Sequence, residues 1–169
     1  MQLLNLMQYP EAISRLASWH YQEWHHLFPK RTEQDFANEL AECLQTESPQ
    51  VQPQLPQTWV LCSDAGEICG SVSLLLADMT TNRDLSPWLA NVFIAPAYRG
   101  QGYGQTVVKA AMQQALQLHI RQLYLFTPDQ QAFYQRLGWQ VLKEEWYEGE
   151  RVTIMTWRVN PAQVELFAI

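Results

Sequence analysis

Hydrophobic and polar positions follow two different periods along the chain, and the changes of period predict its elements. Alternation predicts a strand, whereas apolar residues three or four positions apart predict a helix. Residues 2–7 alternate loosely and predict a short first strand. A helix is predicted from Pro10 to about His26, because proline suits a first turn and the apolar positions recur at helical spacing, namely at Ile13, Leu16, Ala17, His20 and Trp24.

A second helix is predicted after Thr32. Thr32 and Asp35 have the spacing of a capping box, in which the two side chains bond each other's backbone N–H groups. The apolar face of this helix would be formed by Phe36, Leu40 and Leu44. Residues 45–57 contain three prolines and several glutamines and predict a loop.

The remaining chain predicts six strands and two helices. The strands are expected at Trp59–Ser63, Ile68–Leu76, Trp88–Ile94, Leu123–Phe126, Trp139–Glu145 and Arg151–Val159. Turns are expected at residues 64–66 and 148–149, and a wide polar connection at residues 78–87. One helix is predicted over residues 102–118, and a short one over residues 129–137 that ends at Gly138.

These elements follow the order β-α-α-β-β-β-α-β-α-β-β. That order predicts the α/β (α+β) class, with a mixed, mostly antiparallel twisted sheet flanked by helices. The helix over residues 102–118 would be the crossover between two parallel strands. A length of 169 residues suits one domain, so we expect residues 1–169 to form it.

Composition and charge narrow the function. Hydrophobic residues make up 47% of the chain and charged residues 17%, which argues against disorder. The net charge is −6, and no run of Lys or Arg occurs, so a nucleic-acid role is disfavoured while a cationic partner is compatible. No stretch approaches the ~20 apolar residues of a membrane span. The N-terminal residues do not resemble a signal peptide, so we expect a cytoplasmic protein without a membrane partner.

Cysteine and histidine suggest neither a disulfide framework nor a metal site. Cys43, Cys62 and Cys69 are odd in number and form no C-x-x-C pair, so reduced buried thiols are expected. The histidines over residues 20–26 lack a second cluster that would complete a metal site.

Three of the seven glycines, Gly100, Gly102 and Gly104, fall within five residues between a predicted strand and a predicted helix. Glycine allows a tight turn and close approach of a ligand, and the first N–H groups of a helix point outward without an internal partner. This arrangement is typical of a phosphate site. The dinucleotide fingerprint would need glycine in place of Gln105, and no P-loop string occurs. A glycine-rich corner without a ligand is the alternative.

Two segments resemble the GCN5-related N-acetyltransferase (GNAT) family. Residues 99–104, after the strand ending at residue 94, resemble its acetyl-CoA signature [RQ]-x-x-G-x-[GA]. Residues 133–139, with Tyr134, Gly138 and Trp139, resemble its later motif L-Y-x-x-x-G-[FW]. The order of elements also resembles this fold over roughly residues 58–158. A bacterial-type single-domain member is implied.

The resemblance implies acetyl-CoA as the co-substrate. The loop would bind its pyrophosphate, and the preceding strand, splayed from its neighbour, would bond the pantetheine arm. The implied coenzyme-binding residues are Val92, Phe93, Ile94, Arg99, Gly100, Gln101, Gly102, Tyr103, Gly104 and Gln105. Arg99 would either add charge to the site or tie the loop down.

The resemblance further implies transfer of an acetyl group to a primary amine by direct attack in a ternary complex. Tyr134 would act as general acid to the departing thiolate, or pack as a core aromatic. The chain departs from the family at two positions. Thr127 replaces an asparagine found in many members, and Trp88 stands where some members have a glutamate base. Candidate bases elsewhere are Glu23, Asp84 and Glu145.

The acceptor implied is a small-molecule amine or a peptide N-terminus. Trp24 and Trp88 are expected on the acceptor side, where other aromatic candidates are Tyr21, His25, His26, Trp146 and Tyr147. Family members are often dimers, so a homodimer is implied. Two rival functions are a non-catalytic acyl-CoA-binding regulatory module and a transferase that uses a cysteine nucleophile, although no cysteine adjoins the motifs.

Overall fold

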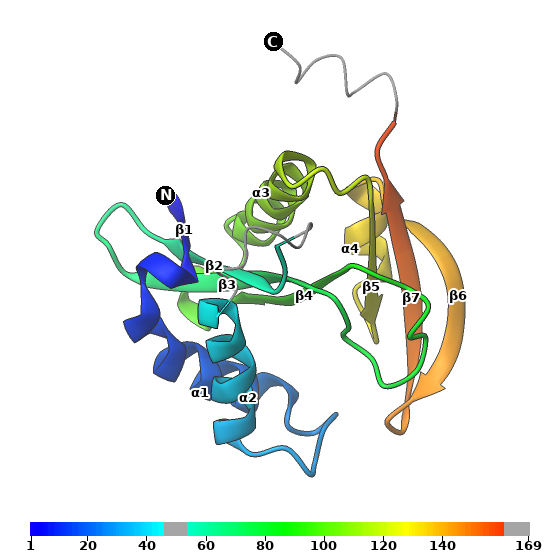
Figure 1. The fold of residues 1–169 in the computed structure, drawn as a ribbon, viewed down its shortest axis with the longest axis horizontal. Helices are drawn as coiled ribbons and strands as arrows, with labels where there is room; N and C mark the ends of the chain where they lie inside the picture. The colour runs from blue at the N-terminus through cyan, green and yellow to red at the C-terminus, as the bar shows by residue number, and fades with distance from the viewer. Residues whose placement is uncertain (46–53, 161–169) are drawn as a thin grey trace.

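A computed structural model describes residues 1–45 and 54–160 of the chain (Figure 1). Most of the loop predicted over residues 45–57 lies outside the described residues. The strands are β1 (Gln2–Asn5), β2 (Gln57–Cys62), β3 (Ile68–Leu75), β4 (Trp88–Ile94), β5 (Gln122–Thr127), β6 (Gln140–Tyr147) and β7 (Glu150–Arg158). The α-helices are α1 (Ile13–Trp24), α2 (Glu33–Glu42), α3 (Tyr103–Gln117) and α4 (Gln131–Arg136).

In the described part of the chain, the strands form one seven-stranded sheet in the order β1-β2-β3-β4-β5-β7-β6. Its neighbours are antiparallel except for β4 and β5, which are parallel and joined by the crossover helix α3. The predicted fold class, element order and crossover are therefore confirmed.

Helices cover both faces of the sheet, with α1 and α2 on one face and α3 on the other (Figure 1). The larger core packs α3 and α4 against the sheet through buried residues such as Val107, Ala111, Leu123 and Leu125. On the opposite face, α1 and α2 bury Leu16 and Leu40 among others. Residues of β5 alternate between the faces, so Leu123 and Leu125 enter the first core while Phe126 joins an aromatic cluster on the other side.

Element boundaries differ from the prediction at a few ends. Residues 10–12 form a 3₁₀ turn, and α1 begins at Ile13 and ends at Trp24 rather than His26. The capping box at Thr32 and Asp35 is present, with each backbone N–H bonded by the other side chain. The polar connection between β3 and β4 contains neither helix nor strand, as predicted.

Candidate active site

The parallel strands β4 and β5 touch at one end only. Trp88 and Tyr124 are their one paired position in the described chain, supported by a 3.0 Å bond from the Tyr124 N–H to the Pro87 carbonyl. Beyond Trp88 the strands diverge, so the edge of β4 over residues 89–94 faces β5 without a ladder of hydrogen bonds. Backbone groups left unpaired in this way need a partner from water or a ligand.

A β-bulge shapes the same stretch of β4. Asn91 and Val92 together lie opposite Val72 of β3, and Asn91 adopts a φ of 53°. The Ser71 hydroxyl donates to the Asn91 carbonyl at 2.9 Å, and His20 of α1 lies 2.8 Å from that hydroxyl through Nε2. The Ser71 hydroxyl has one proton and donates it to the Asn91 carbonyl. The proton of the hydrogen bond between His20 and Ser71 must therefore lie on His20 Nε2.

His20 is held neutral in this position. Burial, with a smaller effect from the positive charge of Arg31, lowers the pKa of His20 to about 3. A neutral imidazole with a fixed tautomer therefore anchors the bulge across the physiological range.

The glycine loop lies directly after β4 and leads into α3. Gly100 and Gly102 have φ values of 74° and 83°, a conformation that residues with a side chain rarely adopt. Gly102 is the N-cap of α3, so the free N–H groups of Tyr103, Gly104 and Gln105 point out of the helix end. The side chain of Gln101 turns away, and its amide donates to the Ala97 carbonyl at 3.3 Å.

Arg99 ties this loop to two other elements. Its Nε donates to the Ile94 carbonyl at 2.8 Å, and its Nη2 forms an ion pair with Glu23 of α1 at 3.0 Å. Its guanidinium also lies 5.5 Å from the centre of the Phe93 ring. The sequence left two roles open for Arg99, adding charge to the site or anchoring the loop. These contacts are those of an anchor.

A cavity of about 1580 Å³ begins at this loop and follows the gap between the strands. We call the part formed by Gly100–Gln105 and the edge of β4 the glycine-loop end. The cavity continues past Tyr134 of α4 to Tyr147, where β6 turns into β7. It therefore offers a long ligand a backbone-lined channel and a second compartment beyond it.

Tyr134 lines this cavity with 9% of its surface exposed. Burial, with smaller effects from the charges of Asp129 and Asp78, raises the pKa of Tyr134 well above its usual range. No hydrogen bond found in the described residues involves its hydroxyl. The phenol is therefore protonated and available as a donor to a ligand.

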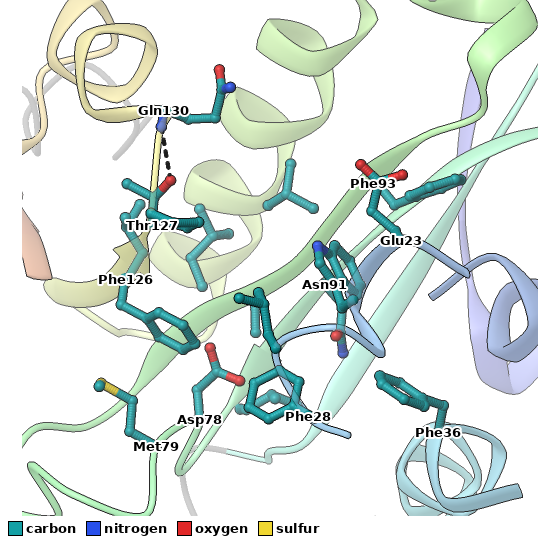
Figure 2. A pocket seen from close by; sticks show the side chains of 18 of the residues that line it. Glu23, Phe28, Phe36, Asp78, Met79, Asn91, Phe93, Phe126, Thr127 and Gln130 are labelled. Carbon is teal, nitrogen blue, oxygen red and sulfur yellow. Dashed lines mark hydrogen bonds between the residues drawn. The ribbon is translucent and has the colours of Figure 1, made fainter. Parts of the chain in front are cut away.

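Thr127 also lines the cavity, at the end of β5. Its hydroxyl accepts a hydrogen bond from the Gln130 N–H at 3.0 Å and so shapes the turn into α4 (Figure 2). The Thr127 side chain therefore stabilises the local turn.

Only some of the aromatic residues expected on the acceptor side line the cavity. Trp24, His26 and Tyr147 line the cavity, whereas Tyr21 and His25 do not. Trp88, also expected on the acceptor side, does not line the cavity: its side chain is 1% exposed, and its indole N–H donates to the Leu85 carbonyl at 2.7 Å. β4 begins with Trp88, whose ring packs inside the aromatic cluster behind the cavity wall. Trp146 is 76% exposed and lies away from the cavity.

The three carboxylates suggested as bases are poorly placed for that role. Glu23 reaches the cavity but is paired with Arg99. Asp84 is exposed and is absent from the cavity wall. Glu145 forms an ion pair with Lys143 and accepts a hydrogen bond from Asn82. Partial burial acts to raise the pKa of Glu145, but these bonds outweigh it and lower the pKa.

Of the residues that form the far side of the cavity, sequence reasoning named Tyr147 but missed the other three. We call it the aromatic end and define it by Phe28, Asp78, Phe126 and Tyr147, which all line the cavity. Figure 2 shows the Asp78 carboxylate between the rings of Phe28 and Phe126. The alternation along β5 could have placed Phe126 on this face, but Asp78 looked like one more polar residue of a connecting loop.

The described residues also bear on metal binding and on membrane crossing. No group of three or more His, Cys, Asp and Glu side chains there is arranged to hold a metal ion. None of the helices in that part of the chain combines the length and the apolar character needed to cross a membrane.

The family model described as an acetyltransferase (GNAT) domain matches residues 55–141, which are 87 of the 169 residues. This range contains the diverging strands, the glycine loop and Tyr134. No curated protein matches the chain significantly.

Solved structures share the fold. Aminoglycoside 6'-acetyltransferase type Ii superposes with a TM-score of 0.69 at 14% identity, covering 95% of this chain and 99% of that one. An aminoglycoside 6'-N-acetyltransferase complexed with coenzyme A has a TM-score of 0.68 at 13% identity, covering 95% and 98%. A GNAT acetyltransferase from Elizabethkingia anophelis with acetyl-CoA bound has a TM-score of 0.51 at 15% identity, covering 72% and 82%. At these identities the likeness concerns the fold.

Proposed function

Because the chain belongs to the GNAT acetyltransferase family, we propose that it transfers the acetyl group of acetyl-CoA to a primary amine by direct attack in a ternary complex. The observation that carries this proposal is the divergence of β4 and β5 beside the glycine loop. A long ligand with amides in the middle and a diphosphate at one end suits this combination.

At the glycine-loop end, the N–H groups at the start of α3 would bind the pyrophosphate, because they are unpaired and the helix dipole favours an anion there. The edge of β4 at Val92, Phe93 and Ile94, which has no ladder to β5, would bond the pantetheine amides. Arg99 would act as a positioning residue, since its guanidinium is already engaged by Ile94 and Glu23.

Tyr134 would be the general acid. The amine nitrogen attacks the thioester carbonyl carbon, a C–N bond forms, and the C–S bond then breaks with its electron pair moving to sulfur. The Tyr134 hydroxyl would donate to that sulfur as charge develops on it, and this hydrogen bond strengthens in the transition state. The acceptor would be a small amine or a peptide N-terminus. Relatives of this fold include aminoglycoside acetyltransferases.

Two measurements test the proposal. Calorimetry with coenzyme A and acetyl-CoA should show one binding event per chain. A thiol-release assay with acetyl-CoA should then identify acceptors in a panel of alkylamines, amino acids, aminoglycosides and peptide N-termini.

The outcomes separate the rival functions. Thiol release that depends on both acetyl-CoA and an amine supports the transferase. Binding of the coenzyme without release across the panel would favour the non-catalytic module instead. A folded sample that gives no heat with either form of the coenzyme would overturn both. Alkylation of the cysteines should leave release unchanged, because all three are buried away from the cavity.

A further inference from the structure

Three rings form the walls of the aromatic end. The ring of Tyr147 stands nearly perpendicular to that of Phe126, with centroids 5.5 Å apart, and to that of Phe28, with centroids 6.5 Å apart. Trp88 supports Phe126 from behind at 6.4 Å. The compartment therefore presents rigid aromatic surfaces, which attract organic cations as well as apolar groups.

Asp78 is held against these walls by its neighbours in the chain. Met79 is 5% exposed and belongs to the aromatic cluster, and the next residue, Thr80, donates its N–H to the Tyr147 hydroxyl at 3.1 Å. At the base of the same loop, the Ser86 hydroxyl donates to the Leu76 carbonyl at 2.7 Å. Asp78 therefore sits on a loop that is fixed on both sides.

The Asp78 carboxylate has no partner of its own in the described chain, where neither a hydrogen bond nor an ion pair to it is found. Arg31 is the cation that acts on it electrostatically. The Arg31 guanidinium is paired with Glu39 and lies 4.1 Å from the centre of the Phe36 ring. A partly buried carboxylate without a partner is costly, and a bound cation would relieve that cost.

The base candidates suggested by the sequence are less well placed than Asp78. β4 begins with a buried tryptophan, and the three carboxylates suggested by the sequence are paired or lie outside the cavity. Asp78 combines a place on the cavity wall with a free carboxylate. Its charge also acts on the Tyr134 phenol, and both residues line the cavity.

We propose that Asp78 is the catalytic base of the transfer and that the acceptor carries a primary ammonium on an apolar stem that packs against the rings of the aromatic end. This inference rests on the proposed function. Asp78 would first take one proton from the ammonium and pass it to solvent, and it would take a second from the nitrogen as the bond to the acetyl carbon forms. Tyr134 would donate its proton to the sulfur as the C–S bond breaks and would regain one from solvent. The products are the acetamide and coenzyme A thiol, and the Asp78 proton returns to solvent.

The charges around Asp78 suit this role. Burial, with a contribution from the negative charge of Glu39, raises the pKa of Asp78 to about 7, while Arg31 acts in the opposite direction. Tyr134 also lines the cavity, and its raised pKa keeps this phenol neutral. A base works best when its pKa lies near the working pH.

The test compares Asp78→Asn with Asp84→Asn, which removes an exposed carboxylate from the same loop. With acetyl-CoA and the best primary amine of the panel, D78N should lose about 100-fold in kcat/KM, and D84N should match the wild type. The wild-type kcat/KM should rise with pH through about 7, because the base must lose its proton, and D78N should lack this step. Coenzyme affinity should stay the same in all three.

A second readout does not need turnover. The carboxyl resonance of Asp78, assigned with D78N, is titrated in the coenzyme A complex with and without n-butylammonium, and the cation should lower the pKa of Asp78. The same rate and pH profile in D78N and wild type, or a titration unmoved by saturating butylammonium, would overturn the role of Asp78. Neither result would contradict acetyl transfer itself, which fails only if the wild type neither binds coenzyme nor releases thiol.

Discussion

The two ends of the cavity differ in the groups that form them, backbone at one end and side chains at the other. The glycine-loop end consists of backbone groups from one continuous stretch, residues 89–105. The aromatic end consists of side chains from four distant segments, which meet only in the folded protein: Phe28, Asp78, Phe126 and Tyr147. A backbone site can keep its shape while side chains change. The shape of the aromatic end depends instead on its side chains, so it is where acceptor choice would reside.

Tyr134 lines the cavity that contains both ends, and changing it should have the largest effect. Tyr134→Phe should lower kcat by about 100-fold and leave coenzyme affinity unchanged, because only the proton donor to sulfur is lost. Stability should hardly change, since no protein group bonds that hydroxyl in the described chain. Steady-state kinetics and calorimetry check this, with Tyr124→Phe, a tyrosine outside the cavity, as the control. Equal kcat in Y134F and wild type would remove Tyr134 from the mechanism.

The glycine-loop end should bind coenzyme more weakly when its backbone is displaced. A Cβ on Gly70 of β3 would lie 2.2 Å from the Phe93 carbonyl oxygen of β4, so one strand must move. Gly70→Ala should cost about 1–3 kcal/mol of unfolding free energy, as overpacking does, and weaken coenzyme binding. Denaturant unfolding and calorimetry measure the two effects.

A stability control lies in α3. A Cβ on Gly104 would meet only the tip of the Phe133 ring at 3.6 Å, an ordinary contact. Gly104→Ala should therefore unfold at the same denaturant concentration as the wild type or a higher one, since alanine favours a helix. If G70A proved as stable as G104A, the close approach of β3 and β4 would not matter.

The same division explains what the sequence could predict. The glycine loop, its strand and its helix are contiguous, so spacing alone indicated them, and the fold followed from periodicity in each segment. The divergence of β4 from β5 depends on pairing between residues 36 positions apart, Trp88 and Tyr124, and on a bulge held by His20. Only the family resemblance suggested it.

The aromatic end was harder to predict for a physical reason. Asp78 differs from Asp84 in the burial of its neighbour Met79, a tertiary property that no local pattern encodes. Trp88 was expected on the acceptor side, yet the face of β4 on which it lies is covered by the aromatic cluster.

His20, whose hydrogen bond to Ser71 holds the β4 bulge, tests how much one side chain stabilises the glycine-loop end. Its pKa is about 3 in the folded protein and about 6.5 when unfolded, so the unfolded chain binds more protons below pH 6.5. Wild-type stability should therefore fall by about 2 kcal/mol between pH 7 and pH 5 from this group alone. His20→Gln keeps a donor for Ser71 without titrating and should lose less over that interval.

The control for this measurement is His25→Gln, an exposed histidine just after the same helix, which should follow the wild-type pH dependence. Because other groups titrate over this range, the informative quantity is the difference between the two variants in denaturant unfolding at each pH. Parallel curves for H20Q and H25Q would mean that His20 does not remain neutral in the folded state.

The smallest effect should come from the aromatic walls. Phe28→Leu keeps an apolar side chain but removes a ring that faces the acceptor, and one cation–π contact contributes about 0.5–1 kcal/mol. The KM for a primary amine should therefore rise about two- to fivefold, while coenzyme affinity stays the same. Trp146→Leu, which alters an exposed ring outside the cavity, should leave both constants unchanged. A rise in KM with W146L but not with F28L would place the acceptor on the outer face of the β6–β7 hairpin and leave the aromatic end without a ligand.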